Sequence, residues 1–314
     1  MKKTYLAAIL LLGLLSSCET TEVVYDPQET LPEFTAPTPQ EFTGLQNQAL
    51  ENITQEFTFD ANAPITNYTS AKGVVVSIYG GCFTKNGIPV TGNVDLEFIE
   101  LFDRGNMLVT NKATMGVLPG GEQRLLISGG EFYINVTQNG EQLELPCGFQ
   151  LTVPASLSGG LDTDMTSFSG TIDAAGNMVW NSSQTDFWAG GENNQEPFYN
   201  AFLQDFGWFN CDKFASFDGP MTDIQVFVPE GYTEANSNIF IAIPGEPNTL
   251  GYLSGQSPVG LECYLIFVTA NADGGFAYAI KTVTLTADAS YSFTSDEIEE
   301  VTTAELIALI NALP

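Results

Sequence analysis

The amino-acid sequence predicts an all-β protein made of two antiparallel β-sandwich domains with a short C-terminal helix. Segments such as "NVDLEFIELF" (93–102) alternate apolar and polar residues with the period of two that is typical of a strand with one buried face. Asn-Gly pairs at 86–87 and 139–140 predict tight hairpin turns. Because the strands follow one another at short intervals with no helical pattern between them, their spacing favours sandwiches.

The first 17 residues have the features of a secretory signal peptide. Lys2 and Lys3 give a basic start, and residues 5–15 form an apolar stretch that is too short to cross a bilayer, which needs about 20 apolar residues. The stretch ends in "LSSC" (15–18), which resembles the lipobox of bacterial lipoproteins. In that family a peptidase cuts before the cysteine, and the new N-terminal cysteine carries acyl chains. The resemblance implies that Cys18 anchors the protein to a membrane by lipid; a soluble exported protein with an incidental cysteine is the alternative.

Residues 18–54 are expected to form a tether between this anchor and the folded part. They contain four prolines, several acids and no basic residue, so they have little apolar surface to bury and are predicted to stay extended. A short helix at 45–53 is the alternative. Glu19 and Glu22 resemble the surface-export signal of Bacteroidota lipoproteins. That resemblance implies an outer-membrane lipoprotein of the cell envelope that faces the cell exterior.

Residues 55–157 are predicted to form the first sandwich. Its strands are read from "GVVVSIYGG" (73–81), the segment at 93–102, "EFYINVTQNGEQLEL" (131–145) and "GFQLTVPA" (148–155). This order of strands and turns resembles the ZU5-like β-sandwich of Bacteroidota surface proteins. Some animal ZU5 domains cut themselves at a His-Phe-Ser motif. The chain contains no histidine, so the resemblance implies the fold and not this activity.

Residues 158–217 are predicted to connect the two sandwiches. The first part is rich in Gly, Ser, Thr and Asp, and the second part is rich in aromatic residues. In "EPFYNAFLQDF" (196–206) the rings of Phe198, Phe202 and Phe206 recur every four residues. This spacing places them on one face of a helix, so a short helix is predicted here.

The same aromatic-rich stretch contains the best candidates for a binding site. Trp188, Tyr199 and Trp208 are the candidates for stacking on sugar rings, with nearby carboxylates and amides to bind the hydroxyls. The alternative is that these rings fill the interface between the two sandwiches, since aromatic side chains mostly serve cores and interfaces. The polar candidates are Asp186, Glu192 and Asn194.

Residues 218–314 are predicted to form a second sandwich of the Ig-like or transthyretin-like type. The segment "TTAELIALINAL" (302–313) ends the chain as a helix that is expected to pack on this domain. Thr302 and Glu305 give it a capping-box pattern, in which each side chain bonds to the other's backbone. The predicted strands lie in "DIQVFVP" (223–229), "NIFIAIPG" (238–245), "GLECYLIFVTAN" (260–271) and "FAYAIKTVTLTAD" (276–288).

Four cysteines remain once Cys18 is assigned to lipid. An exported protein keeps disulfides, and an even number fits pairing. Four cysteines allow three pairings. Cys82 with Cys147 and Cys211 with Cys263 is favoured, because neither pair then joins one proposed sandwich to the other. Four buried free thiols, which pack as small apolar side chains, are the alternative.

The composition excludes several kinds of function. The chain has 9 basic and 38 acidic residues and a net charge of −29, which argues against nucleic acid as a partner, because phosphate binding needs clustered Lys and Arg. It has no histidine, which excludes Ser-His-Asp and Cys-His catalysis and histidine-based zinc sites.

Calcium is the one metal that the acids suggest, because Ca²⁺ takes oxygen ligands. Asp162 with Asp164, and the turn at Asp273, are acidic enough to consider, but neither has the spacing of an EF-hand. Solvated acidic loops are the alternative. The sequence contains no recognisable catalytic motif, although a pair of carboxylates remains the route by which such a chain would hydrolyse glycosides.

We therefore expect a cell-envelope lipoprotein, held to the membrane by its N-terminal lipid, that acts in binding, adhesion or scaffolding. Its partner would be an extracellular protein or glycan. A carbohydrate-active enzyme that uses paired carboxylates is the alternative. An open cleft with two facing acids would favour the enzyme, whereas buried aromatic residues would favour the binding or scaffold role.

Overall fold

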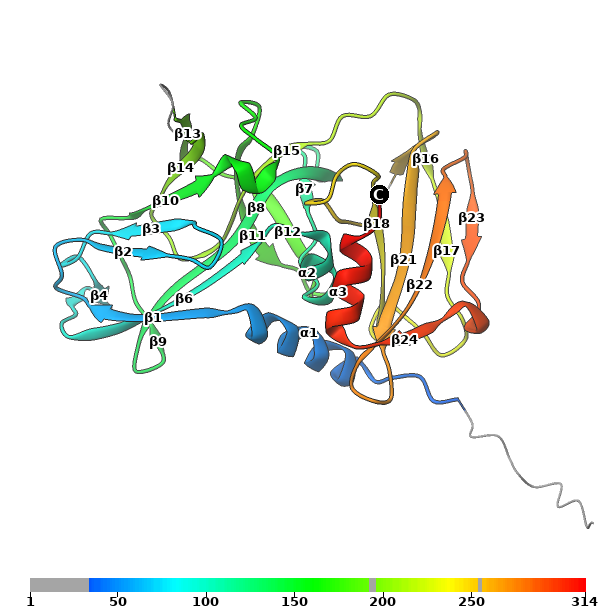
Figure 1. Cartoon of the computed structure of the whole chain (residues 1–314), viewed down its shortest axis with the longest axis horizontal. Helices are drawn as coiled ribbons and strands as arrows, with labels where there is room; N and C mark the ends of the chain where they lie inside the picture. The colour runs from blue at the N-terminus through cyan, green and yellow to red at the C-terminus, as the bar shows by residue number, and fades with distance from the viewer. Residues whose placement is uncertain (1–33, 192–195, 254–255) are drawn as a thin grey trace, which may run out of the picture. The chain divides into compact units, whose positions relative to one another are not determined.

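A computed structural model describes residues 34–191, 196–253 and 256–314 of the chain. In these ranges the protein is mostly β-strand with few helices, which confirms the prediction of a β-rich protein (Figure 1). Residues Ala36–Pro314 form one compact unit. The signal-peptide residues, Cys18, Glu19 and Glu22 lie outside the described ranges, as do Glu192 and Asn194.

The largest sheet has the strand order β1-β6-β8-β15-β11-β12-β7, with β9 beside β8. Its pairings are antiparallel except that β12 runs parallel to β7. Because β7 also pairs with β8, the strands β7, β8, β15, β11 and β12 close into a ring. The strands are β1 (Gln55–Asp60), β6 (Asn93–Leu101), β7 (Met115–Val117), β8 (Gln123–Gln138), β9 (Glu141–Gln142), β11 (Thr166–Ile172), β12 (Met178–Ser182) and β15 (Gly207–Phe214).

Large side chains pack closely within this ring, and two glycines make room for them. A Cβ on Gly116 would lie 2.7 Å from Leu126 Cδ2, and a Cβ on Gly170 would lie 2.7 Å from Trp180 Cζ3. Real Cβ atoms do not approach so closely, so only glycine fits at these two positions. The buried cluster that they accommodate consists of Leu126, Phe168, Met178 and Trp180.

The second sheet has the order β13-β14-β10-β3-β2, and all its pairings are antiparallel. The second sheet and the largest sheet share one buried cluster. Phe98 and Phe132 come from the largest sheet, and Val76 and Phe149 come from the second. This core is dense in aromatic rings, which bury much apolar area per residue. The strands are β2 (Thr66–Thr69), β3 (Val75–Ile78), β10 (Phe149–Pro154), β13 (Asp186–Gly190) and β14 (Phe198–Leu203).

The helix predicted at 196–206 is wrong, because this segment forms β14. Tyr199, Ala201 and Leu203 are buried while Phe202 is only half-buried, so the burial follows the strand period of two more closely than the helix period. The strand also pairs on both sides, with β10 and with β13. Backbone pairing in the sheet therefore overrides the four-residue spacing of the phenylalanines.

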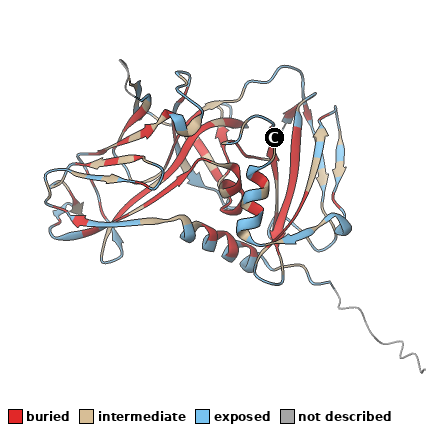
Figure 2. Ribbon diagram, viewed as in Figure 1, coloured by how far each residue is buried: buried red, intermediate tan, exposed pale blue. Residues whose placement is uncertain are grey.

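A third sheet has the order β19-β18-β21-β22-β24, again antiparallel. Figure 2 shows buried residues along nearly all of its central strand β21. The strands are β18 (Ser237–Ala242), β19 (Gly251–Tyr252), β21 (Glu262–Ala270), β22 (Phe276–Thr284) and β24 (Glu299–Val301). Three short ladders pair β4 (Thr84–Lys85) with β5 (Ile88–Pro89), β16 (Met221–Asp223) with β20 (Gln256–Pro258), and β17 (Gln225–Phe227) with β23 (Ser290–Ser292).

The chain predicted to be an extended tether is helical from residue 39 onward. Helix α1 (Pro39–Ile53) begins six residues before the helix considered at 45–53. The Thr38 side chain accepts a hydrogen bond from the Glu41 N–H, and the Glu41 carboxylate accepts one from the Thr38 N–H, which completes a capping box. One face carries buried apolar residues at the spacing of a helix: Phe42, Leu45 and Ala49.

Two further helices lie side by side: α2 (Arg104–Val109) and α3 (Thr303–Asn311) (Figure 1). The predicted C-terminal helix and its Thr302 capping box are both present. Together with α1 they pack in one buried cluster with Leu101 of β6 and Ile266 of β21. The two predicted sandwich domains therefore share a core, and the proposed border at residue 218 separates no independent unit.

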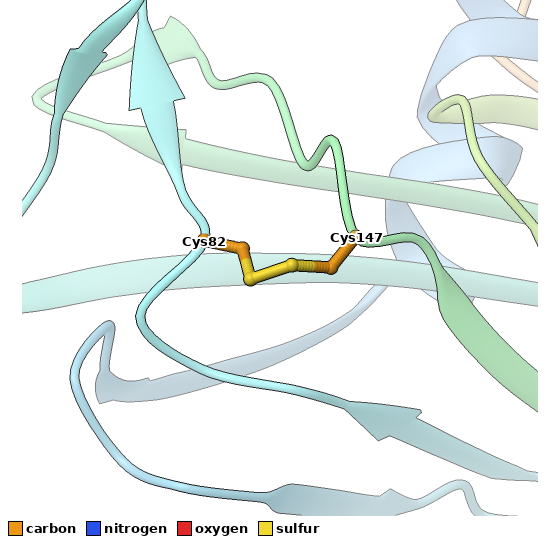
Figure 3. Close-up of a disulfide and its surroundings, with 2 residues drawn as sticks. All are labelled: Cys82 and Cys147. Carbon is orange, nitrogen blue, oxygen red and sulfur yellow. A yellow bond between two sulfur atoms is a disulfide. The ribbon is translucent and has the colours of Figure 1, made fainter.

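One of the two predicted disulfides is present. Cys82 and Cys147 are joined, with their Cα atoms 6.0 Å apart and a sequence separation of 65 (Figure 3). The pairing of Cys211 with Cys263 is wrong, because both are free and buried. Cys211 packs in the core between the first two sheets and Cys263 in a cluster of the third sheet, so they belong to different cores.

Candidate ligand-binding cleft

The three rings considered for sugar stacking share no exposed face. Trp188 on β13 is 44% exposed, whereas Tyr199 on β14 is 1% exposed. Trp208 on β15 is half-buried, with its ring centroid 5.3 Å from that of Tyr133 and 5.6 Å from Lys112 Nζ. The structure therefore does not assemble these rings into a platform.

Trp208 and Asp186 do line one cavity, of about 510 Å³, beside the turn between β14 and β15. Phe202 and Phe206 line it as well. The Phe206 ring stacks on Phe149 with centroids 5.5 Å apart, so this ring is engaged with the core. The aromatic-rich stretch thus contributes to a cavity while most of its rings pack on neighbouring rings.

A wider cleft of about 1020 Å³ opens at the end of β15. It is built from four stretches that are far apart in sequence, within 127–128, 157–165, 213–217 and 243–248. Such a cleft is at the upper end of the volume range of ligand sites. Its ionisable side chains are Asp162, Asp164, Lys213 and Glu246.

An apolar pocket of about 320 Å³ adjoins this cleft, and the segment 214–217 lines both cavities. Phe217 and Met221 line the pocket although they are 36% and 38% exposed. We call the two cavities together the Phe217 cleft. Buried apolar residues and several polar ones complete the pocket: Met115, Leu125, Ile241 and Pro258, with Gln123, Arg124, Ser216, Gln256 and Ser257.

A buried tyrosine holds the loop that carries the first acid of the cleft. The Tyr199 hydroxyl accepts a hydrogen bond from the Asp162 backbone N–H at 2.6 Å and donates one to the Gly160 carbonyl at 3.3 Å. Asp162 Oδ1 accepts a bond from the Asp164 N–H at 2.9 Å, and Asp162 Oδ2 accepts one from Lys213 Nζ at 2.6 Å. Tyr199 therefore positions a wall of the cleft and does not stack on a ligand.

The carboxyl groups of the cleft differ in their electrostatic surroundings. The hydrogen bond from Lys213 is the main reason that the pKa of Asp162 lies below its ordinary value. Partial burial raises the pKa of Glu246, and the positive charge of Lys213 opposes this rise. The same hydrogen bond to Asp162 raises the pKa of Lys213. Two acids in one cleft are thus shifted in opposite directions, an arrangement that is also found in sites that transfer protons.

The two places considered for calcium are organised by other contacts, and Asp162 is the acid among them whose carboxylate is paired. Lys213 binds a carboxylate oxygen of Asp162. At the second place, Asn271 Oδ1 accepts bonds from the backbone N–H groups of Asp273 and Gly275, which forms a closed turn. In the part of the chain that the structure describes, no three His, Cys, Asp or Glu side chains come together to hold a metal ion.

Two carboxyl groups that the sequence does not single out are fully buried in the largest sheet. Glu131 of β8 and Asp212 of β15 are each 0% exposed. Asp212 accepts hydrogen bonds from Asn210 Nδ2 at 2.7 Å and from the Gly129 N–H at 3.2 Å, whereas no described residue bonds to either oxygen of Glu131. Burial raises the pKa of both groups well above the ordinary value; Asp212 raises the pKa of Glu131 further, and Lys112 opposes that rise.

Comparisons with known proteins give no match: no protein-family model, no curated protein and no solved structure resembles this chain. No helix among the described residues is both long enough and apolar enough to cross a bilayer.

Proposed function

We propose that this protein is a lipid-anchored protein of the bacterial cell envelope that binds an extracellular ligand without turning it over. The Phe217 cleft carries the proposal, because it joins an open cavity of about 1020 Å³ to an apolar pocket of about 320 Å³. Ligand sites are typically concave, with apolar walls and a few polar groups that fix orientation. Strand residues of β7, β8, β18 and β20 supply much of the wall of the smaller pocket, and sites on such elements are held more precisely than sites on loops, whereas Phe217 and the acids lie on the loops that meet there.

Two independent observations support export and anchoring. The basic start, short apolar stretch and "LSSC" of residues 15–18 together resemble a lipoprotein signal. The Cys82–Cys147 disulfide is the kind of bond that persists in oxidising compartments and is rare in the cytosol. More than one acyl chain is needed for stable anchoring, and lipidation of a lipobox cysteine supplies several.

The anchor is tested by Cys18→Ala. The wild-type protein is expected to sediment with membranes and to enter the detergent phase in Triton X-114 partition, because its acyl chains are the anchor. The variant is expected to lose at least nine-tenths of that membrane fraction, whereas Cys211→Ala should keep it. Equal membrane fractions for wild type and Cys18→Ala would refute the lipid anchor.

Binding in the cleft is tested with the mature chain carrying Cys18→Ala, presented to immobilised cell-envelope material. We expect Phe217→Ala to weaken binding at least tenfold, since an anchoring aromatic residue typically contributes 2 kcal/mol or more at an interface. Phe227→Ala removes a ring that is 53% exposed and lies outside the cleft, so it serves as the matched control. Equal loss from both variants would contradict the proposal. Protease treatment and periodate treatment of the envelope material separate protein ligands from glycan ligands.

A carbohydrate-active enzyme is the second candidate, and one observation favours it. Asp162 and Glu246 line the same cleft, and their pKa values are shifted in opposite directions from the ordinary value. A general acid needs a raised pKa while its partner stays ionised. Release of reducing sugar from envelope glycan, abolished by Glu246→Gln, would favour this function over non-catalytic binding.

A further inference from the structure

We propose that the ligand of the Phe217 cleft is an extended cationic segment of a partner protein that carries an apolar anchor side chain. This inference depends on the proposed binding function and names the chemistry of the partner. Two properties of the cleft support it. One is the excess of acid in its open part, and the other is the size and exposure of its apolar part.

The open part of the cleft carries more negative than positive charge. Asp162, Asp164 and Glu246 line it together with one cation, Lys213, which is already paired with Asp162 at 2.6 Å. No ion pair between described residues involves Asp164 or Glu246. Two carboxylates are therefore available to a ligand, and a Lys or Arg side chain is the group that forms charge-assisted hydrogen bonds with them.

The acidic surface continues beyond these two carboxylates. Asp218 and Glu262 line a neighbouring cavity that also contains Phe217. The chain as a whole has 38 acidic residues against 9 basic ones. A negative electrostatic field accelerates the approach of a cationic partner and repels anionic partners such as nucleic acid or sulfated glycans. A neutral glycan would gain nothing from it.

The apolar part of the cleft fits a large apolar side chain of the partner. Its volume of about 320 Å³ lies at the lower end of the range for ligand sites. Phe217 and Met221 are exposed large apolar residues that line one pocket, and such an arrangement usually marks an interaction site. Arg124 also lines this pocket, and its positive charge repels a basic residue. The partner's basic residues are therefore expected at the acidic part of the cleft, and the partner's apolar anchor in this pocket.

The wall that the two cavities share sets the spacing between the basic group and the apolar group of the partner. The four residues 214–217 line both cavities, and four residues of extended chain span at most roughly 14 Å. A partner in extended conformation would therefore carry its basic and apolar groups about four residues apart. This spacing can be written directly into a probe peptide.

The test uses three fluorescein-labelled peptides and the mature chain with Cys18→Ala, measured by fluorescence anisotropy. The first peptide, GKKSGLFG, has basic residues and an apolar anchor at the inferred spacing. GEESGLFG reverses the charge, and GKKSGSSG removes the anchor. We expect the first peptide to bind at least tenfold more tightly than either of the others. Raising the salt from 50 to 300 mM should weaken its binding severalfold.

Variants locate the binding. Phe217→Ala and Glu246→Gln are each expected to weaken binding of GKKSGLFG at least fivefold, whereas the controls Phe227→Ala and Glu300→Gln lie outside the cleft and should not. Failure of GKKSGLFG to bind, or binding that the cleft variants do not alter, would overturn the inference. If GEESGLFG binds as tightly and Phe217→Ala weakens that binding, the inferred positive charge of the partner is wrong. If GKKSGSSG does so, the inferred apolar anchor is wrong. In either case the cleft remains a binding site. Failure of the proposed function itself would appear separately, as envelope binding that Phe217→Ala does not change.

Discussion

Replacing Arg104 by Leu is expected to lower the free energy of unfolding by about 3 kcal/mol or more, because three backbone carbonyls lose a donor. Arg104 begins α2, is 1% exposed and donates hydrogen bonds to backbone carbonyls near the end of the chain and just after β18. Its Nε bonds to Ile310 O at 3.0 Å, its Nη1 to Ile243 O at 3.3 Å, and its Nη2 to Leu313 O. The variant leaves these carbonyls without the guanidinium donor, and an unsatisfied buried polar group costs about 1–3 kcal/mol.

Urea unfolding followed by circular dichroism measures this change. Arg124→Leu is the matched control, because Arg124 is the other arginine of the chain and is exposed. The control is expected to stay within about 0.5 kcal/mol of wild type, as surface substitutions usually do. Arg104→Lys should recover little, because the lysine ammonium lacks the fixed fork that reaches several carbonyls at once. A wild-type value for Arg104→Leu would show that the last helix holds its position without the arginine.

Stability is expected to fall as the pH rises from 5 to 8, and Glu131→Gln should remove much of this fall. The folded protein raises the pKa of Glu131 and Asp212 well above the ordinary value, chiefly by burial. In this pH range the folded state keeps protons that the unfolded state has released, so each group lowers the unfolding free energy by up to about 1.4 kcal/mol per pH unit. The stabilisation is fully present below the unfolded pKa values and is lost as the pH approaches the folded ones.

Lys112 limits this loss of stability with rising pH at the alkaline end of the pH range. Burial lowers the pKa of Lys112 to about 8, so above that pH the folded state binds fewer protons at this position than the unfolded state, and its contribution has the opposite sign. The predicted fall is therefore steepest below about pH 8.

Thermal melts of wild type and variants at pH 5, 6, 7 and 8 provide the measurement. Glu131→Gln and Asp212→Asn keep the shape of the side chain without a titrating proton, so each is expected to melt higher than wild type at pH 8 and to show a shallower slope. Glu300→Gln changes an exposed acid of β24 and serves as the control for general charge repulsion. A slope that is the same in all four proteins would refute the assignment to the buried pair.

The parts of the fold that could be predicted are those that depend on local pattern. The alternation at 93–102 gives β6, and Asn139-Gly140 forms a turn in which both residues have positive φ, 54° and 77°. Thr302 and Glu305 form the capping box that begins α3. Each of these is decided by interactions between residues that are close in sequence or directly paired.

The parts that could not be predicted depend on contacts between distant segments. Phe198, Phe202 and Phe206 have helical spacing, but strand pairing with β10 and β13 decides their conformation. Cys211 and Cys263 both lie on strands whose buried side faces a core, and the cores differ. No periodicity reveals either placement, because both follow from sheet order.

The candidate site shows the same limit. The sequence marks Asp162 and Asp164 as acidic, yet their cleft exists only because Lys213 and Glu246 approach from other segments. Glu131 lies opposite Asn210 in the sheet, a pairing that only the strand register reveals. A carboxylate inside an apolar-looking strand is the one sequence signal that would have drawn attention to it, since buried acids are rare without a partner.

The bond between Cys82 and Cys147 ties the maturation of this protein to its surroundings. It closes a loop spanning 65 residues, a constraint worth about 4 kcal/mol in the chain-entropy description. A chain kept in a reducing compartment lacks that constraint, and its first two sheets are then held by their shared core and by hydrogen bonds such as that from the Tyr68 hydroxyl to Gln55 Oε1. The reduced chain is thus easier to unfold than the bridged one, which is the property that the proposed export across a membrane requires.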